Sequence, residues 1–173
     1  MLYGVHGIGK STFAAEAPGA VFLPTEDGIA DIDCESYPLS TCFDQFMHYL
    51  QELHDEDHDR STLVIDSLDW LEQLIWAEVG REQKVDSIED IGYAKGYTFA
   101  LKHWRKVLEK LEELRDARGM TSILLAHAKI ERYTPPDNDA FDRYSPKLHK
   151  HASSIVQEWC DEVLFANYQV YTQ

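Results

Sequence analysis

Hydrophobic positions along the chain follow two patterns. Short continuous apolar runs are typical of strands that are buried on both faces, and apolar residues spaced three and four apart are typical of amphipathic helices. The continuous runs predict strands at 20–23, 62–65 and 121–126, a stub at 1–3 and a last strand at 162–166. The helical spacing predicts helices at 11–17, 43–53, 68–79, 99–115 and 147–159.

The order of these elements predicts the fold class. Apolar strands separated by helices form mainly parallel sheets with helices on both faces, so we expect a three-layer α/β/α domain over residues 1–173. The segment 133–146 is rich in Pro, Asp and Asn and predicts a loop. Strands usually have five or six residues, so the stub at 1–3 predicts that the chain lacks part of its first strand.

Composition restricts the class of protein further. Hydrophobic residues make up 44% and charged residues 27%, which is globular rather than disordered composition. No apolar run approaches the roughly 18 residues that a membrane span needs, and no secretory signal is visible. The three cysteines include no C-x-x-C pair, which argues against a disulfide framework or a zinc ribbon. We therefore expect a cytoplasmic protein with no membrane partner.

Charge is unevenly distributed. The net charge is −15, which repels nucleic acid at long range. Residues 26–90 hold nineteen acids and three bases, whereas residues 91–173 hold eleven acids and twelve bases. The acidic half is typical of a solvated surface, and an anionic polymer would have to contact the C-terminal half.

The N-terminal segment contains a complete phosphate-binding motif. Residues 4–11 match G-x-x-x-x-G-K-[ST] at every fixed position, between an apolar stub and a helix, and this context disfavours a chance glycine turn. The glycines let backbone N–H groups face phosphate oxygens, Lys10 reaches the β and γ phosphates, and Ser11 is placed to bind Mg²⁺. The predicted ATP site comprises Gly4, Val5, His6, Gly7, Ile8, Gly9, Lys10, Ser11 and Thr12.

Three polar residues follow predicted strands, at the edge where parallel strands meet a ligand crevice. Asp66 ends an apolar strand as a Walker B aspartate does, and we expect it to hold Mg²⁺ through a water; the alternative is a helix cap. Glu26 is placed to orient or deprotonate the attacking water, with Asp27 as an equal competitor by position. His127 is placed to contact the γ-phosphate; the alternative is a histidine bonded to backbone.

Four segments together resemble the phage-type P-loop nucleotide-binding proteins. These segments are residues 4–12, 22–28, 63–67 and 125–129. The group is similar to the RecA-like recombinase core, and some members act as single-strand annealing proteins. The resemblance implies a RecA-like fold, ATP hydrolysis with Mg²⁺, and a role in phage DNA recombination or replication in the host cytoplasm.

The resemblance also implies roles for particular positions. Glu26 falls where RecA-like ATPases keep the glutamate that activates water, which favours it over Asp27. His127 falls at the position of a γ-phosphate sensor that is usually glutamine, and segment 133–146 at that of a mobile DNA-binding loop. The strands expected after residue 168 are short or missing. RecA-like ATPases often work between subunits, which implies a homo-oligomer and an arginine supplied by a neighbour.

Basic residues in and beside segment 133–146 are candidate contacts to single-stranded DNA. Three aspartates in the same segment, Asp137, Asp139 and Asp142, weaken that inference, and the bases at 147–151 are equally typical of a solvated helix start. The candidate DNA contacts are Arg132, Arg143, Lys147 and Lys150, of which the two arginines are also the candidates for the arginine acting in a neighbouring subunit.

Three other functions share the phosphate-binding motif. A nucleotide kinase is suggested by Asp142-Arg143-Tyr144, but prolines rather than a buried strand precede this tripeptide. A GTPase is disfavoured because no Asn-Lys-x-Asp segment is present. An accessory module that binds ATP without useful hydrolysis stays open.

Overall fold

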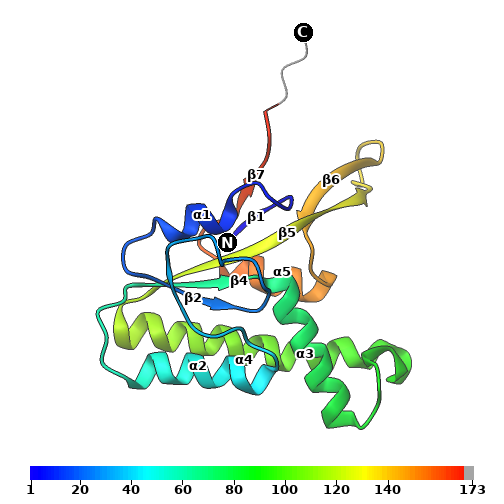
Figure 1. The fold of residues 1–173 in the computed structure, drawn as a ribbon. Coiled ribbons are helices and arrows are strands. Elements are labelled where there is room, and N and C mark those ends of the chain that lie inside the picture. Colours follow the sequence, from blue (N-terminus) through cyan, green and yellow to red (C-terminus); the bar gives the residue numbers. More distant parts are fainter. Residues whose placement is uncertain (170–173) are drawn as a thin grey trace.

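The computed structural model describes residues 1–169, with the backbone alone at Ala94. The strands are β1 (Leu2–Gly4), β2 (Ala20–Pro24), β3 (Glu35–Ser36), β4 (Thr62–Asp66), β5 (Thr121–Tyr133), β6 (Phe141–Pro146) and β7 (Leu164–Ala166). The helices are α1 (Lys10–Ala15), α2 (Phe43–Asp55), α3 (Leu68–Gln83), α4 (Lys95–Arg118) and α5 (Lys150–Trp159), with 3₁₀ turns at Ile88–Asp90 and Gly92–Ala94. Figure 1 shows their arrangement.

The strands form a mostly parallel central sheet, as the sequence predicts. Their order is β3-β2-β4-β5-β1-β7, and every neighbouring pair along this path is parallel. The strand β5 lies between β1 and β4, with Leu125 opposite Leu2 and Ile123 opposite Val64. The carboxyl ends of these three strands therefore lie side by side, which brings the loops that follow them together.

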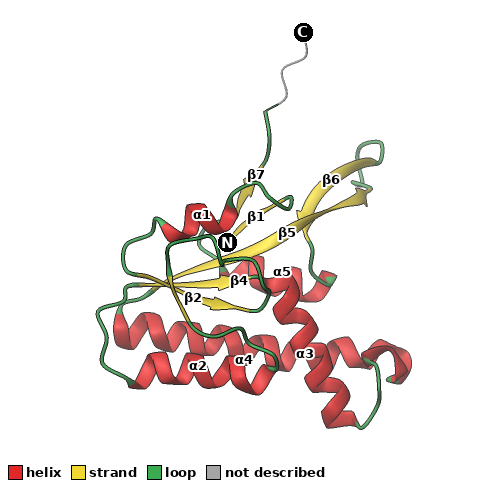
Figure 2. Cartoon of the chain, in the orientation of Figure 1, coloured by secondary structure: helices red, strands yellow, loops and turns green. Residues whose placement is uncertain are grey.

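Helices cover both faces of the sheet because apolar strand residues alternate between two cores. Val21, Leu63 and Leu124 belong to the larger core, against α2, α3, α4 and α5. Phe22 and Val64 belong to the smaller core, against α1. Figure 2 shows α1 on one side of the strands and the long helices on the other. No helix among residues 1–169 is long and apolar enough to cross a membrane.

The predicted loop at 133–146 is wrong in part: residues 134–140 are irregular, but Tyr133 and residues 141–146 belong to the strands of a β-hairpin. The strand β5 continues to Tyr133, and β6 pairs with its second half in antiparallel fashion. Arg143 lies opposite Glu131, Asp142 opposite Arg132, and the rings of Tyr133 and Phe141 contact edge to face. Cross-strand pairs of opposite charge and of aromatic rings stabilise a hairpin. Five of the Pro, Asp and Asn residues that suggested a loop, at 135–139, lie in its turn, whereas Asp142 and Pro146 lie in β6.

The helix that the sequence predicts at 147–159 begins three residues later in the structure, at Lys150. Lys147 instead prolongs the strand ladder, since its backbone N–H donates to the carbonyl of His127 at 2.8 Å. The helix α5 begins at Lys150, with His149 preceding it in an extended conformation. Segment 147–149 is therefore a bent connection that starts beside His127, and the Leu148 N–H donates back to the carbonyl of Pro146 at 2.8 Å.

Candidate functional site

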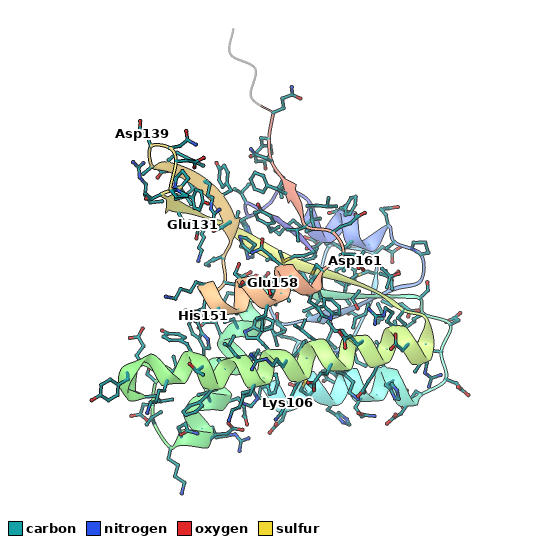
Figure 3. The ribbon with its side chains drawn as sticks, turned by 180° about the vertical axis from the view of Figure 1, so that it is seen from behind. Lys106, Glu131, Asp139, His151, Glu158 and Asp161 are labelled. Carbon is teal, nitrogen blue, oxygen red and sulfur yellow. The ribbon has the colours of Figure 1, made fainter. Side chains whose placement is uncertain are left out.

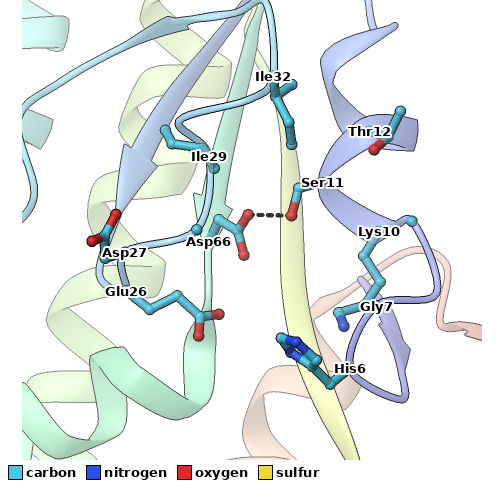
Figure 4. A pocket seen from close by; sticks show the side chains of 12 residues that line it. His6, Gly7, Lys10, Ser11, Thr12, Glu26, Asp27, Ile29, Ile32 and Asp66 are labelled. Atoms are coloured by element: carbon cyan, nitrogen blue, oxygen red, sulfur yellow. Dashed lines mark hydrogen bonds between the residues drawn. The ribbon is translucent and has the colours of Figure 1, made fainter.

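At two positions in the loop between β1 and α1, the backbone has a conformation that only glycine adopts readily. Gly7 and Gly9 have φ of 73° and 94°, in the left-handed region that other residues rarely enter. A Cβ on Gly4 would lie 2.7 Å from the carbonyl oxygen of Ala166. The loop borders a cavity of about 310 Å³, which residues after β2 and at the end of β4 also line. Because the sequence predicts an ATP site at this loop, we call this space the ATP cavity (Figure 4).

Lys10 carries its charge at the wall of the ATP cavity. Its side chain is buried, and its Nζ donates to the carbonyls of Gly4 at 3.3 Å and Val5 at 3.2 Å. Burial lowers the pKa of Lys10, and the carboxylates of Asp66 and Glu26 oppose this shift. The ammonium is thus poorly hydrated, which strengthens its attraction for a polyanion, while the nearby carboxylates favour its charged form.

Ser11 and Asp66, which are 55 positions apart, meet in the ATP cavity. The Ser11 hydroxyl donates to Oδ2 of Asp66 at 2.5 Å (Figure 4). Burial raises the pKa of Asp66, and the bond from Ser11 opposes the shift. A hydroxyl and a carboxylate beside a phosphate-binding loop are oxygen ligands of the kind that Mg²⁺ prefers, so the two residues fit this ion.

Glu26 rather than Asp27 faces the centre of the ATP cavity. Its Oε1 lies 3.9 Å from Nδ1 of His127, and its side chain is 21% exposed. Figure 4 shows the Glu26 carboxylate turned inward, whereas Asp27 is exposed and turned outward. Burial raises the pKa of Glu26, and the neighbouring Ser67 and His127 oppose this shift. The geometry therefore favours Glu26 of the two acids.

Thr25 fixes the ends of β2 and β4 to each other. Its hydroxyl donates to the carbonyl of Ser67 at 2.6 Å and accepts from the N–H of the same residue at 2.9 Å. Its own N–H donates to the carbonyl of Asp66 at 2.7 Å. These buried bonds hold the two acids, Glu26 and Asp66, in a fixed relation.

Asp69, in the first turn of α3, holds His127 and was missed in the sequence. It accepts from the backbone N–H of His127 at 3.0 Å, and its Oδ2 lies 3.0 Å from Nδ1 of the imidazole. This bond raises the pKa of His127. Burial works against ionisation of Asp69, but the bonds from His127 lower its pKa overall. The carboxylate of Asp69 thus bonds both the backbone N–H and the imidazole of His127.

The sequence held only a weak signal for Asp69. An acid in the first turn of a helix is ordinarily explained by the helix dipole. Its partner His127 lies 58 positions away. Only the sheet order, with β5 beside β4, brings the two together.

The four candidate DNA contacts lie on the hairpin β5–β6 and the segment after it, and three of them have acidic partners. Arg132 pairs with Asp142 at 3.3 Å. Arg143 pairs with Glu131 at 2.8 Å. Lys147 lies 4.0 Å from Asp69, and Lys150 has no ion pair with any residue in 1–169. Part of the positive charge that the sequence suggested is therefore neutralised locally.

A glycine loop around a helix start, a buried lysine and a Ser–Asp pair on a parallel sheet define a P-loop NTPase. Comparison with known families agrees, since residues 1–173 match the family described as an AAA domain. The chain belongs to this AAA domain family. No curated protein matches the chain.

Proposed function

We propose that residues 1–173 form one ATPase domain that hydrolyses ATP in the presence of Mg²⁺. The observation that carries this proposal is the convergence of three groups on one cavity. Lys10 supplies a cation, Ser11 and Asp66 supply oxygen ligands, and Glu26 supplies a base. His127 stands beside this base, with its Nδ1 3.9 Å from Oε1 of Glu26. Mg²⁺, held by Ser11 and through a water by Asp66, would neutralise charge on the β and γ phosphates.

Hydrolysis would use the remaining residues as follows. Glu26 accepts a proton from the water whose oxygen attacks the γ-phosphorus, and the raised pKa makes this carboxylate a stronger base while it is ionised. The bond between the γ-phosphorus and the bridging oxygen breaks, and Lys10 stabilises the charge left on the β-phosphate. His127, held by Asp69, donates toward the oxygens of the transferred group.

The direct test is the release of phosphate from ATP with and without Mg²⁺. ADP and phosphate should appear only when the ion is present. Transfer of the phosphoryl group to a nucleoside monophosphate would identify the kinase alternative instead. Tight ATP binding without turnover would identify the accessory module.

We further propose that this ATPase acts in phage DNA recombination or replication, by binding or annealing single-stranded DNA in the host cytoplasm. The support is the group of exposed cations on and after the hairpin, Arg132, Arg143, Lys147 and Lys150, together with the resemblance to annealing proteins. The strand β5 joins the two sites directly, since His127 lies on the same strand as Arg132. We also propose a homo-oligomer in which one subunit supplies an arginine to the ATP cavity of its neighbour. The candidates are Arg132 and Arg143, which are both exposed. Anisotropy of labelled single-stranded DNA tests it.

A further inference from the structure

A second polar cavity, of about 370 Å³, lies between the hairpin β5–β6 and the helix α5. We call it the hairpin pocket. One wall carries polar residues of the hairpin, and the other is a single face of α5 with helical spacing. Figure 3 shows Glu131 on the hairpin, with α5 and its residues His151 and Glu158 below. The polar lining comprises Lys129, Glu131, Arg143, Ser145, Lys150, Ser153, Ser154 and Gln157, none of which lines the ATP cavity.

The hairpin pocket has an excess of positive charge. Lys129, Arg143 and Lys150 face one acid, Glu131, whose Oε1 accepts both hydrogen bonds from Arg143, at 2.8 and 3.1 Å. Lys129 donates to the carbonyl of Leu148 at 2.7 Å, which leaves two of its three protons for other acceptors. In a chain of net charge −15, this lining is suited to an anion.

Ser145 provides a second and independent sign of a ligand. It is 9% exposed, and its hydroxyl forms no hydrogen bond of ordinary length with any residue in 1–169. The carboxylate of Glu131 stands near this hydroxyl, and its Oε1 accepts the two bonds from Arg143. A buried hydroxyl without a partner is destabilising, and native proteins rarely keep one without a reason. A ligand acceptor in the hairpin pocket would satisfy it.

We propose that the hairpin pocket binds a phosphate group through the ammonium groups of Lys129 and Lys150 and the hydroxyl of Ser145. Phosphate oxygens accept hydrogen bonds, and the pocket offers charged and neutral donors that match them. The source is a backbone phosphate of single-stranded DNA, because the same hairpin and its exit carry the exposed side chains of Arg132 and Lys147. This choice of source rests on the proposed DNA function, whereas phosphate binding does not.

The test uses the full chain with its ATP cavity saturated by Mg²⁺ and a non-hydrolysable ATP analogue, so that the P-loop does not compete. Calorimetry with inorganic phosphate and anisotropy with a labelled oligothymidylate are compared for Ser145→Ala, Lys129→Gln and the control Lys106→Gln. Lys106 is exposed on α4, away from the hairpin (Figure 3). We expect Ser145→Ala and Lys129→Gln each to weaken both ligands roughly tenfold, the scale for a lost bond to a charged group. Lys106→Gln should bind both as the wild type does.

The thermal midpoint of Ser145→Ala separates a ligand role from a structural one. Removing a hydroxyl that has no partner should leave the midpoint unchanged or raise it, while ligand affinity falls. The protein could bind phosphate more weakly in Ser145→Ala and yet bind no DNA. That result would support the pocket, with a free phosphate compound as its ligand, and would refute the DNA function. DNA binding that is equal in the wild type and both variants overturns the pocket and leaves the DNA function standing. A lowered midpoint with unchanged phosphate affinity also overturns it.

Discussion

The ATP cavity and the hairpin β5–β6 share one strand but use their charges differently. In and beside the ATP cavity, Lys10, Asp66 and Asp69 are nearly buried, and Asp66 and Asp69 take partners from separate elements. On the hairpin, Arg132 and Arg143 are exposed and pair with acids directly across the ladder. Buried groups are held in one geometry by several bonds, whereas exposed pairs contribute little and exchange readily with solvent or a ligand. The ATP cavity therefore holds its charged groups in one geometry, as a chemical step requires, whereas the hairpin leaves its cations accessible to a partner.

Substitution of Lys10 should break the ATP cavity most completely. Lys10→Ala removes the cation nearest to the triphosphate, so ATP binding should fall below detection by calorimetry. The exposed Lys106→Ala serves as a control for the loss of a positive charge and should bind as the wild type does. Unchanged affinity in Lys10→Ala would refute the assignment of the loop.

Substitution of Asp69 tests whether hydrolysis requires the bonds that orient His127, and not only the imidazole itself. Asp69→Asn keeps an acceptor for the N–H of His127 but loses the negative charge that favours the imidazolium. We expect kcat to fall roughly ten- to a hundredfold, a usual scale for residues that orient a reacting group. KM for ATP should change little, since the loop contacts persist. An increase in KM with unchanged kcat would show that Asp69 only shapes the binding site.

Glu72, in α3, binds the segment that connects the hairpin to α5, and its burial predicts a pH dependence of stability. Its buried carboxylate accepts from the N–H of His149 at 2.9 and 3.1 Å, and burial raises its pKa to about 7. Because folding favours the protonated form, its stabilising contribution is full below the unfolded pKa near 4.5 and is lost as the pH rises through 7. Between about pH 5.5 and about pH 8, the unfolding free energy of the wild type should fall by about 2 kcal/mol relative to Glu72→Gln.

Urea unfolding of the two proteins at both pH values checks this prediction. Glu72→Gln keeps an oxygen acceptor for His149, so it isolates the charge. A constant difference between the two proteins across the range would mean that Glu72 is ionised throughout.

The smallest expected effect concerns the hairpin. Since Arg132 and Arg143 already have acidic partners, few phosphates should be neutralised, and the log–log salt slope for single-stranded DNA should be roughly −2 to −3. Anisotropy titrations over a range of salt concentrations measure the slope. A slope far steeper than this would mean an extended cationic surface and would remove the contrast between the two regions.

The sequence predicts those parts of the molecule whose physical reason is local. The phosphate-binding loop depends on eight adjacent residues, and the parallel sheet depends on continuous apolar runs, so both could be predicted. The bond from Asp69 to His127 depends on which strands are neighbours, which no local pattern contains. The hairpin could not be predicted because the residues that form it are largely charged or polar and are stabilised by pairs across the ladder rather than by an apolar pattern. The roles assigned to Glu26 and His127 stay predictions.

Hydrolysis by Glu26→Gln tests the central claim most directly. Single-turnover rates with ATP and Mg²⁺ should be compared for the wild type, Glu26→Gln and Asp27→Asn, with ATP affinity measured for each. We predict that Glu26→Gln binds ATP as the wild type does and hydrolyses it slower by on the order of 10² or more, while Asp27→Asn is unaffected. An unchanged rate in Glu26→Gln, or the loss appearing in Asp27→Asn instead, would contradict the account.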